Sequence, residues 1–159
     1  MADLLTLLNT DPALRDATRL TADRMPRLVV SRSGAVGGFQ NLFASFQTVM
    51  VNSVQIDNFN TFDTSTGEWV VPETGTYEVN GKLRLEDGAR GSLSYGIGLD
   101  VANVDNSGFF WSQGTNNRQG IFNSRIIMLT AGQRLRLYAY VDSPGVGAST
   151  AELNATRIA

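Results

Sequence analysis

Acid–base chemistry in this sequence would have to come from carboxylates. The sequence has no histidine and no cysteine, so the usual imidazole base, thiolate nucleophiles and zinc sites of the common type are excluded. A carboxylate pair of the glycosidase kind remains as an alternative. Glu86 and Asp87 are adjacent, however, and on a strand they would face opposite sides. We expect them to be turn residues, and we predict a protein that is not an enzyme and needs no cofactor.

Oxygen ligands of the kind that calcium prefers occur in the run DVANVDNSG, residues 100–108. Asp100, Asp105 and Asn106 supply them, but their spacing is not that of an EF-hand loop. The same residue types are common in turns. We therefore expect a turn here in preference to a metal site.

A sugar-binding loop is a second candidate site, in the polar run SQGTNNRQG, residues 112–120. Its amide and guanidinium groups are suited to hydrogen bonds with hydroxyls, and Trp111 lies next to it as a stacking surface. The candidate ligand residues are Gln113, Asn116, Asn117 and Arg118. A solvated hairpin loop without a ligand is the simpler interpretation, and both alternatives stay open.

The charge pattern excludes the simplest nucleic-acid and membrane functions. The formal net charge is −2 and no stripe of basic residues is present, so we expect no nucleic-acid partner. No run approaches the roughly 20 apolar residues of a membrane-spanning helix, so we expect no membrane insertion. The first residues, MADLLTLLNTDPALRDATRL, also lack the basic and apolar regions of a signal peptide.

The segment 1–26 has the pattern of short helices. Asp11 followed by Pro12 is a helix start, with a capping carboxylate and then proline at the first helical position. Pro26 ends the pattern. A helix of this length does not fold alone in water, so we expect the segment to dock on its own oligomer or on a larger assembly. The candidate anchor residues are Leu4, Leu5, Leu8, Leu14, Leu20 and Met25.

From Arg27 to the end, the sequence predicts one all-β domain, 27–159. Short β-prone runs alternate apolar and polar residues, most clearly over residues 77–85 and 135–141. Turn residues separate the runs, and about ten strands of this kind indicate an antiparallel sandwich or barrel. The expected strands are 28–32, 43–51, 55–59, 68–71, 76–85, 92–104, 109–111, 120–129, 134–141 and 148–158.

Two motifs in this domain resemble the tumour-necrosis-factor-like superfamily, in particular its complement-q globular-head branch and the phage relatives of that branch. The first is FDTSTGEWVVPETGTYEV, which carries Phe62, Asp63, Thr66, Gly67, Trp69, Pro72, Gly75, Tyr77 and Val79. The second is RIIMLTAGQRLRLYAYV, with Leu129, Ala131, Gly132, Leu135 and Leu137. The sequence departs from the family pattern at Gln133, where an acidic residue is usual, and at Leu153 and Ala155, where Phe and Gly are more frequent.

The resemblance implies a ten-stranded jelly roll that assembles as a homotrimer. In such trimers, aromatic and aliphatic side chains of one sheet meet around the threefold axis. The candidates for the axis or the core are Phe110, Trp111, Phe122, Tyr138 and Tyr140. The sequence does not separate the axis-facing residues from the core-facing ones.

The functional hypothesis that follows is a structural protein on the surface of a tailed-phage or phage-like particle, assembled in the host cytoplasm. A head-decoration or head-fibre protein is the first interpretation, attached through segment 1–26 to capsid or tail proteins and serving capsid stabilisation or host-surface attachment. The alternatives are a tail or baseplate receptor-binding protein and a secreted bacterial adhesin that binds carbohydrate. Host surface polysaccharide is a further partner in these alternatives.

Overall fold

The computed structural model describes residues 24–33, 40–42, 47–85, 95–102, 110–114, 120–141 and 146–159. Regular structure in these ranges is almost entirely strand. The strands are β1 (Arg27–Ser33), β2 (Gln40–Leu42), β3 (Gln47–Thr48), β4 (Ser53–Asp57), β5 (Phe62–Asp63), β6 (Glu68–Val70), β7 (Gly75–Leu85), β8 (Tyr95–Ala102), β9 (Phe110–Gly114), β10 (Gly120–Leu129), β11 (Arg134–Val141) and β12 (Val146–Arg157).

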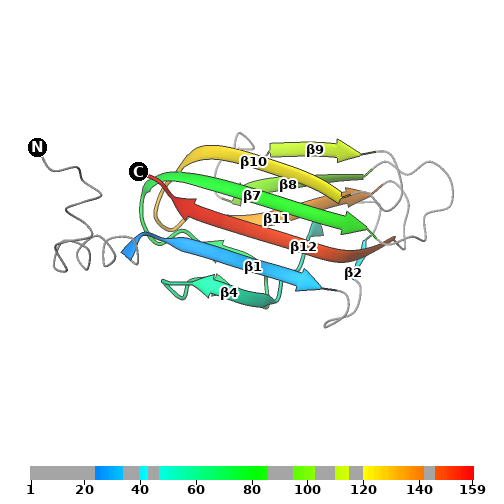
Figure 1. Cartoon of the computed structure of the whole chain (residues 1–159), viewed down its shortest axis with the longest axis horizontal. Helices are drawn as coiled ribbons and strands as arrows, with labels where there is room; N and C mark the ends of the chain where they lie inside the picture. The colour runs from blue at the N-terminus through cyan, green and yellow to red at the C-terminus, as the bar shows by residue number, and fades with distance from the viewer. Residues whose placement is uncertain are drawn as a thin grey trace, which may run out of the picture.

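The strands form two sheets that pack face to face (Figure 1). The first sheet has the order β10-β7-β12-β1-β4, with β2 paired to β12 beyond this path. The second has the order β5-β6-β11-β8-β9, with β3 paired to β11. Every pairing is antiparallel. The expectation of an all-β antiparallel jelly-roll sandwich is therefore confirmed.

The core lies between the sheets and follows the period-2 pattern of the sequence. Along β7, residues 75, 77, 79, 81, 83 and 85 are buried, while most of the residues between them are exposed. The same alternation buries Leu135, Leu137 and Ala139 of β11. Leu153 and Ala155 of β12 are fully buried, so the smaller residues at these positions suit the inner face.

The turn between β5 and β6 brings Trp69 into the core. The amide of Gly67 donates to the carbonyl of Asp63 over 2.8 Å, and Gly67 has a φ of 71°, which favours glycine. Hydrogen bonds from the hydroxyl and the amide of Ser65 hold the Asp63 carboxylate and lower its pKa. Trp69 follows, fully buried, with its ring edge-on to Tyr77 at a centroid distance of 5.7 Å. The motif residues Asp63 and Gly67 thus form the turn, and the motif residues Trp69 and Tyr77 pack in the core.

The turn between β10 and β11 explains one departure from the family pattern. Gly132 has a φ of 86°, and the amide of Gln133 donates to the carbonyl of Thr130 over 3.0 Å. The side-chain oxygen of Gln133 accepts from the amide of Thr130 over 2.7 Å. An amide oxygen makes this bond as a carboxylate oxygen would, so the usual acidic residue is not required here.

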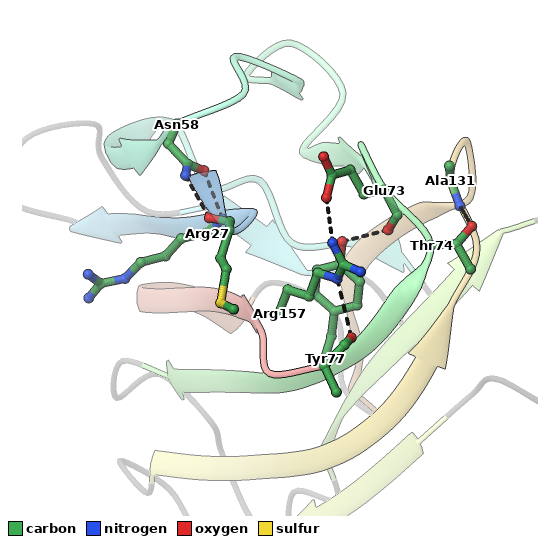
Figure 2. Close-up of polar contacts among 9 residues, drawn as sticks. Arg27, Asn58, Glu73, Thr74, Tyr77, Ala131 and Arg157 are labelled. Carbon is green, nitrogen blue, oxygen red and sulfur yellow. Dashed lines mark hydrogen bonds and ion pairs between the residues drawn. The ribbon is translucent and has the colours of Figure 1, made fainter. Parts of the chain in front are cut away.

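The end of β12 is fixed against the start of β7 (Figure 2). The Tyr77 hydroxyl donates to the carbonyl of Glu73 over 2.6 Å, and Arg157 pairs with the Glu73 carboxylate at 2.5 Å. The carbonyl of Ala159 accepts from the amide of Thr76 over 2.7 Å. A Cβ at Gly75 would lie 2.6 Å from that carbonyl, so only glycine allows this close approach.

One predicted strand is wrong in its extent. The sequence predicts a strand over residues 43–51, but the structure places only the short β3 (Gln47–Thr48) in the described part of this range. Val49 and Val51 are buried in irregular backbone beyond it. The side chain of Gln40 bonds the carbonyl of Thr48 and the amide of Met50, and it thus takes the place of a strand partner.

Replacing Tyr77 by phenylalanine tests the closure at the end of β12. At neutral pH the variant loses one hydrogen bond and should lose about 1 kcal/mol of unfolding free energy. Burial raises the pKa of Tyr77 above its ordinary 10.0, although the charge of Arg157 opposes this. The pKa of Tyr77 is therefore higher in the folded state than in the unfolded state. The stability that the neutral phenol contributes is present below pH 10.0, and it is lost as pH rises through the folded-state pKa.

Urea unfolding from neutral to strongly alkaline pH measures the effect. Tyr77→Phe should flatten the alkaline fall in unfolding free energy, whereas the control Tyr138→Phe should keep it. Parallel alkaline profiles for the wild type and Tyr77→Phe would contradict this role of the buried phenol.

Candidate functional site: an apolar edge strand and a fixed N-terminal junction

A row of apolar side chains lies exposed on β10. Phe122, Ile126 and Met128 have exposed fractions of 60%, 69% and 64%, although each is a large hydrophobic residue. Ser124 continues the same row. Within the described residues β10 pairs with β7 alone, so this strand forms an edge of the first sheet (Figure 1).

The rows beside β10 on the same face are polar. The register places Phe122 opposite Lys82, Ile126 opposite Glu78 and Met128 opposite Thr76. The next strand, β12, continues this face with Glu152, Asn154 and Thr156. The residues of β7 and β12 that lie beside the exposed apolar side chains of β10 are therefore polar.

An exposed apolar edge of this kind is a candidate surface for contact with another chain. Burying one such side chain contributes about 1.5–3 kcal/mol, so three of them make a substantial contribution to association. Edge strands that stay in solvent are more often protected by charges or proline, and β10 has no proline and a single charged residue, Arg125. We call Phe122, Ile126 and Met128 the β10 row.

One pattern in the sequence indicates the β10 row. The run IIML, residues 126–129, is apolar at every position, whereas a strand with one solvent face should alternate. Ile127 and Leu129 pack against or within the core, and Ile126 and Met128 point to the other side. Of the β10 row, Phe122 is among the candidates that the sequence gives for the axis or the core, and Ile126 and Met128 are not.

The five aromatic candidates for the axis or the core do not share a surface. Phe122 lies on the outer face of the first sheet, whereas Phe110, Trp111, Tyr138 and Tyr140 lie in β9 and β11 of the second. The sequence left open which of the five face an axis and which face the core, and the structure divides them between the two sheets. Phe110 is in register with Leu99, and Leu99 is in register with the buried Leu137. Trp111 is in register with Gly98, and Gly98 with Tyr138. Phe110 and Trp111 therefore belong to opposite faces of the second sheet.

The candidate ligand loop is also changed by the structure. Gln113 is a residue of β9 and pairs with Gly96, so its assignment to a loop is wrong. The candidates Asn116, Asn117 and Arg118 lie outside the described residues. Of the calcium candidates, Asp100 is a residue of β8, whereas Asp105 and Asn106 lie outside the described ranges. The carboxylate pair Glu86 and Asp87 also lies outside the described ranges.

The junction between segment 1–26 and the β domain is held by Asn58 (Figure 2). Its side-chain nitrogen donates to the carbonyl of Met25 over 2.7 Å, and its side-chain oxygen accepts from the amide of Arg27 over 2.8 Å. Between them, the buried Pro26 accepts from the amide of Arg157 over 3.0 Å. Three consecutive residues are thus fixed to the turn after β4 and to the end of β12.

Nothing in the sequence indicated this junction, because Asn58 lies more than thirty positions from its two partners. Of the anchor candidates, Met25 is described and is 40% exposed, while Leu4, Leu5, Leu8, Leu14 and Leu20 lie outside the described residues. Their role as an anchor stays a prediction.

The described ranges contain neither a candidate metal site nor a candidate membrane-spanning helix. There, no group of three or more acidic, histidine or cysteine residues gathers to hold a metal ion. In the same ranges the structure has no helix with the length and apolar character of a membrane span.

Solved structures share this fold, among them a complement domain and a phage vertex protein. The globular domain of the zebrafish complement 1qA protein matches with a TM-score of 0.62 and 16% identity, over 86% of this chain and 98% of that one. The PRD1 vertex protein P5 matches with a TM-score of 0.63 and 12% identity, over 84% of this chain and 97% of that one. The resemblance in sequence to the complement-q-like jelly roll and its phage branch is confirmed at the level of the fold.

Sequence comparison adds no closer relative. No known protein family matches the chain. No curated protein matches it either. At these identities the shared architecture is evidence about the fold, so function has to be argued from the surface.

Asn58→Ala tests the junction. The substitution removes two hydrogen bonds, each worth about 0.5–1.5 kcal/mol, and should release the chain around Pro26. Limited digestion with trypsin measures this directly, because the protease cuts after Arg24 and Arg27. Cleavage there should be faster in the variant than in the wild type.

The matched control is Asn52→Ala, which changes another exposed asparagine. It should leave the cleavage rate unchanged. Equal rates for the wild type and Asn58→Ala would mean that Asn58 does not fix the junction.

Proposed function

We propose that this chain is a non-enzymatic structural protein of a bacteriophage or phage-like particle. It forms homotrimers through the β10 row, and segment 1–26 attaches each trimer to a capsid or tail protein. The jelly-roll domain then projects from the virion surface, as a head-decoration or head-fibre protein does.

The observation that carries the particle role is the fold shared with the PRD1 vertex protein P5 over 84% of this chain. The complement head shares the same fold, so architecture alone does not select a function. The fixed junction at Asn58 favours attachment, because a segment that leaves the body in a defined direction can position that body on a particle.

The β10 row supports self-association as the assembly step. An apolar edge strand can meet its own copies around a threefold axis and so remove three large side chains per copy from water. Trimers also multiply the attachment. Three weak anchors on one body bind a lattice far more tightly than a single anchor, because the second and third contacts are intramolecular.

Ile126→Arg tests the assembly surface. A guanidinium at the centre of the β10 row should prevent the apolar contact and yield monomers in analytical ultracentrifugation, while the wild type sediments as a trimer. The monomer should still fold, because position 126 is paired with Glu78 and an arginine there faces an opposite charge across the strands.

The control Thr156→Arg places the same charge on the polar part of the same face and should remain trimeric. A monomeric wild type would contradict the trimer. A trimeric Ile126→Arg would contradict the location of its interface.

The particle role is tested on particles released from cells that carry the gene. Immunogold labelling of purified particles should place the protein on their surface. A strain whose copy lacks residues 1–25 should produce particles without label and leave soluble trimers in the lysate. Unlabelled wild-type particles would contradict the proposal, and labelled particles from the truncated strain would contradict attachment through this segment.

A further inference from the structure

Three exposed apolar side chains lie at the end of the first sheet where the chain enters β1. Met25, Ile158 and Met128 have exposed fractions of 40%, 46% and 64%. Met128 of β10 is opposite Thr76 of β7, and the carbonyl of Thr76 accepts from the amide of Ile158 over 2.8 Å. Met25 comes next across the sheet, since it precedes Pro26, which is bonded to the end of β12. We call Met25, Ile158 and Met128 the end row.

The backbone that carries the end row is held in place. Asn58 bonds the carbonyl of Met25 and the amide of Arg27. The amide of Thr76 donates to the carbonyl of Ala159 over 2.7 Å. Met25 lies in a bend, and a residue before proline disfavours helical backbone. The chain therefore turns out of the line of β1 at a fixed point.

The segment that ends at this point has an apolar stripe of matching length. The sequence predicts a helix that begins at Pro12 and ends before Pro26, and the backbone of Arg24 is helical. Leu14 and Met25 share one face of such a helix, because they are almost three whole turns apart, about 16 Å. From β1 to β10 the first sheet spans three strand spacings, about 14 Å. A helix that crosses the sheet end from Met25 thus reaches β10 with Leu14.

Packing of this helix on the end row stabilises both. A helix of this length is marginal in water by itself, and the end row is apolar surface exposed to water. Thr76, in the middle of the sheet end, is half-buried and uncharged, so the small side chain of Ala17 can approach it. The short tether through Met25 raises the effective concentration of the helix at its own domain above that at any other surface.

We propose that residues 12–25 form a helical arm that packs across the end row of its own domain, with Leu14 at Met128 and Ala17 over Thr76. The arm leaves residues 1–11 beyond the β10 edge. That these residues alone contact the particle rests on the proposed function. The arm itself does not, because it is a contact within one chain.

A designed disulfide tests the arm directly, because the protein has no cysteine. In Ala17→Cys/Thr76→Cys a disulfide should form within each chain, since the arm brings the two Cα atoms within about 7 Å. The control Ala17→Cys/Lys82→Cys has its second cysteine on the same face of β7 but about 20 Å further along, and it should oxidise at least about tenfold more slowly. Non-reducing electrophoresis separates a disulfide within a chain from one between chains. No disulfide in the test pair, a disulfide between chains, or equal rates in both pairs would overturn the proposal.

Proteolysis of the protein without added cysteines gives a second measurement. Trypsin cuts after Arg15 and Arg19, which the packed arm protects. Ile158→Ser removes one apolar contact of the arm and should speed this cleavage about tenfold. The matched control is Val54→Ser, because Val54 is 45% exposed and lies on β4, away from the end row. Urea unfolding verifies that both variants are folded, and equal cleavage rates in the wild type and Ile158→Ser would contradict the arm.

A variant that lacks residues 1–11 separates the arm from the particle role. It should keep the protection of Arg15 and Arg19, and a strain that carries it should release particles without label. Loss of the protection would contradict the arm. Labelled particles would contradict the contact through residues 1–11, and wild-type particles without label would contradict the proposed function itself.

Discussion

The edge-on contact between Trp69 and Tyr77 links the two sheets, and the rest of the structure depends on it. Trp69 belongs to the second sheet and Tyr77 to the first, and both are fully buried. The turn that ends at Gly67 sets the position of the indole. The hydroxyl of Tyr77 holds Glu73, which in turn holds Arg157 near the end of the chain. One aromatic pair therefore couples a surface turn, the core and the last strand.

The sandwich that results has two outer faces with different chemistry. The first sheet is polar except for the β10 row at its edge, and this position favours contact with further copies. On the second sheet, Glu68 pairs with Arg134 and Arg136, and Arg136 lies over the ring of Tyr138. This ion-pair network and the β10 row lie on different sheets.

The described start and the end of the domain meet at one end of the sandwich. The start of β1 and the end of β12 lie together there, since Arg27 is paired with Thr156 (Figure 1). Asn58 and the amide of Arg157 hold the chain on both sides of Pro26. Residues 25–27 are therefore held at a defined point next to the end of β12.

The sequence by itself determined those features of the fold that depend on residues close together in the chain. Alternation identified the inner faces of β7 and β11, and the glycines at 67 and 132 lie where the sequence motifs place turns. The two motifs together identified the jelly roll. These features depend on residues close together in the chain, so a linear pattern records them.

The tertiary structure decided which strand lies beside which. Alternation separates the two faces of a strand, but it does not tell which face or edge belongs to which sheet. For that reason the sequence did not show that the aromatic candidates are divided between two sheets, and it placed Gln113 in a loop although this residue lies in β9. The last strand, β12, inserts between β1 and β7, and its partners lie more than 60 positions earlier. Pairings over such distances are set by closure of the whole core, and they alone bring Trp111, Gly98 and Tyr138 into one row.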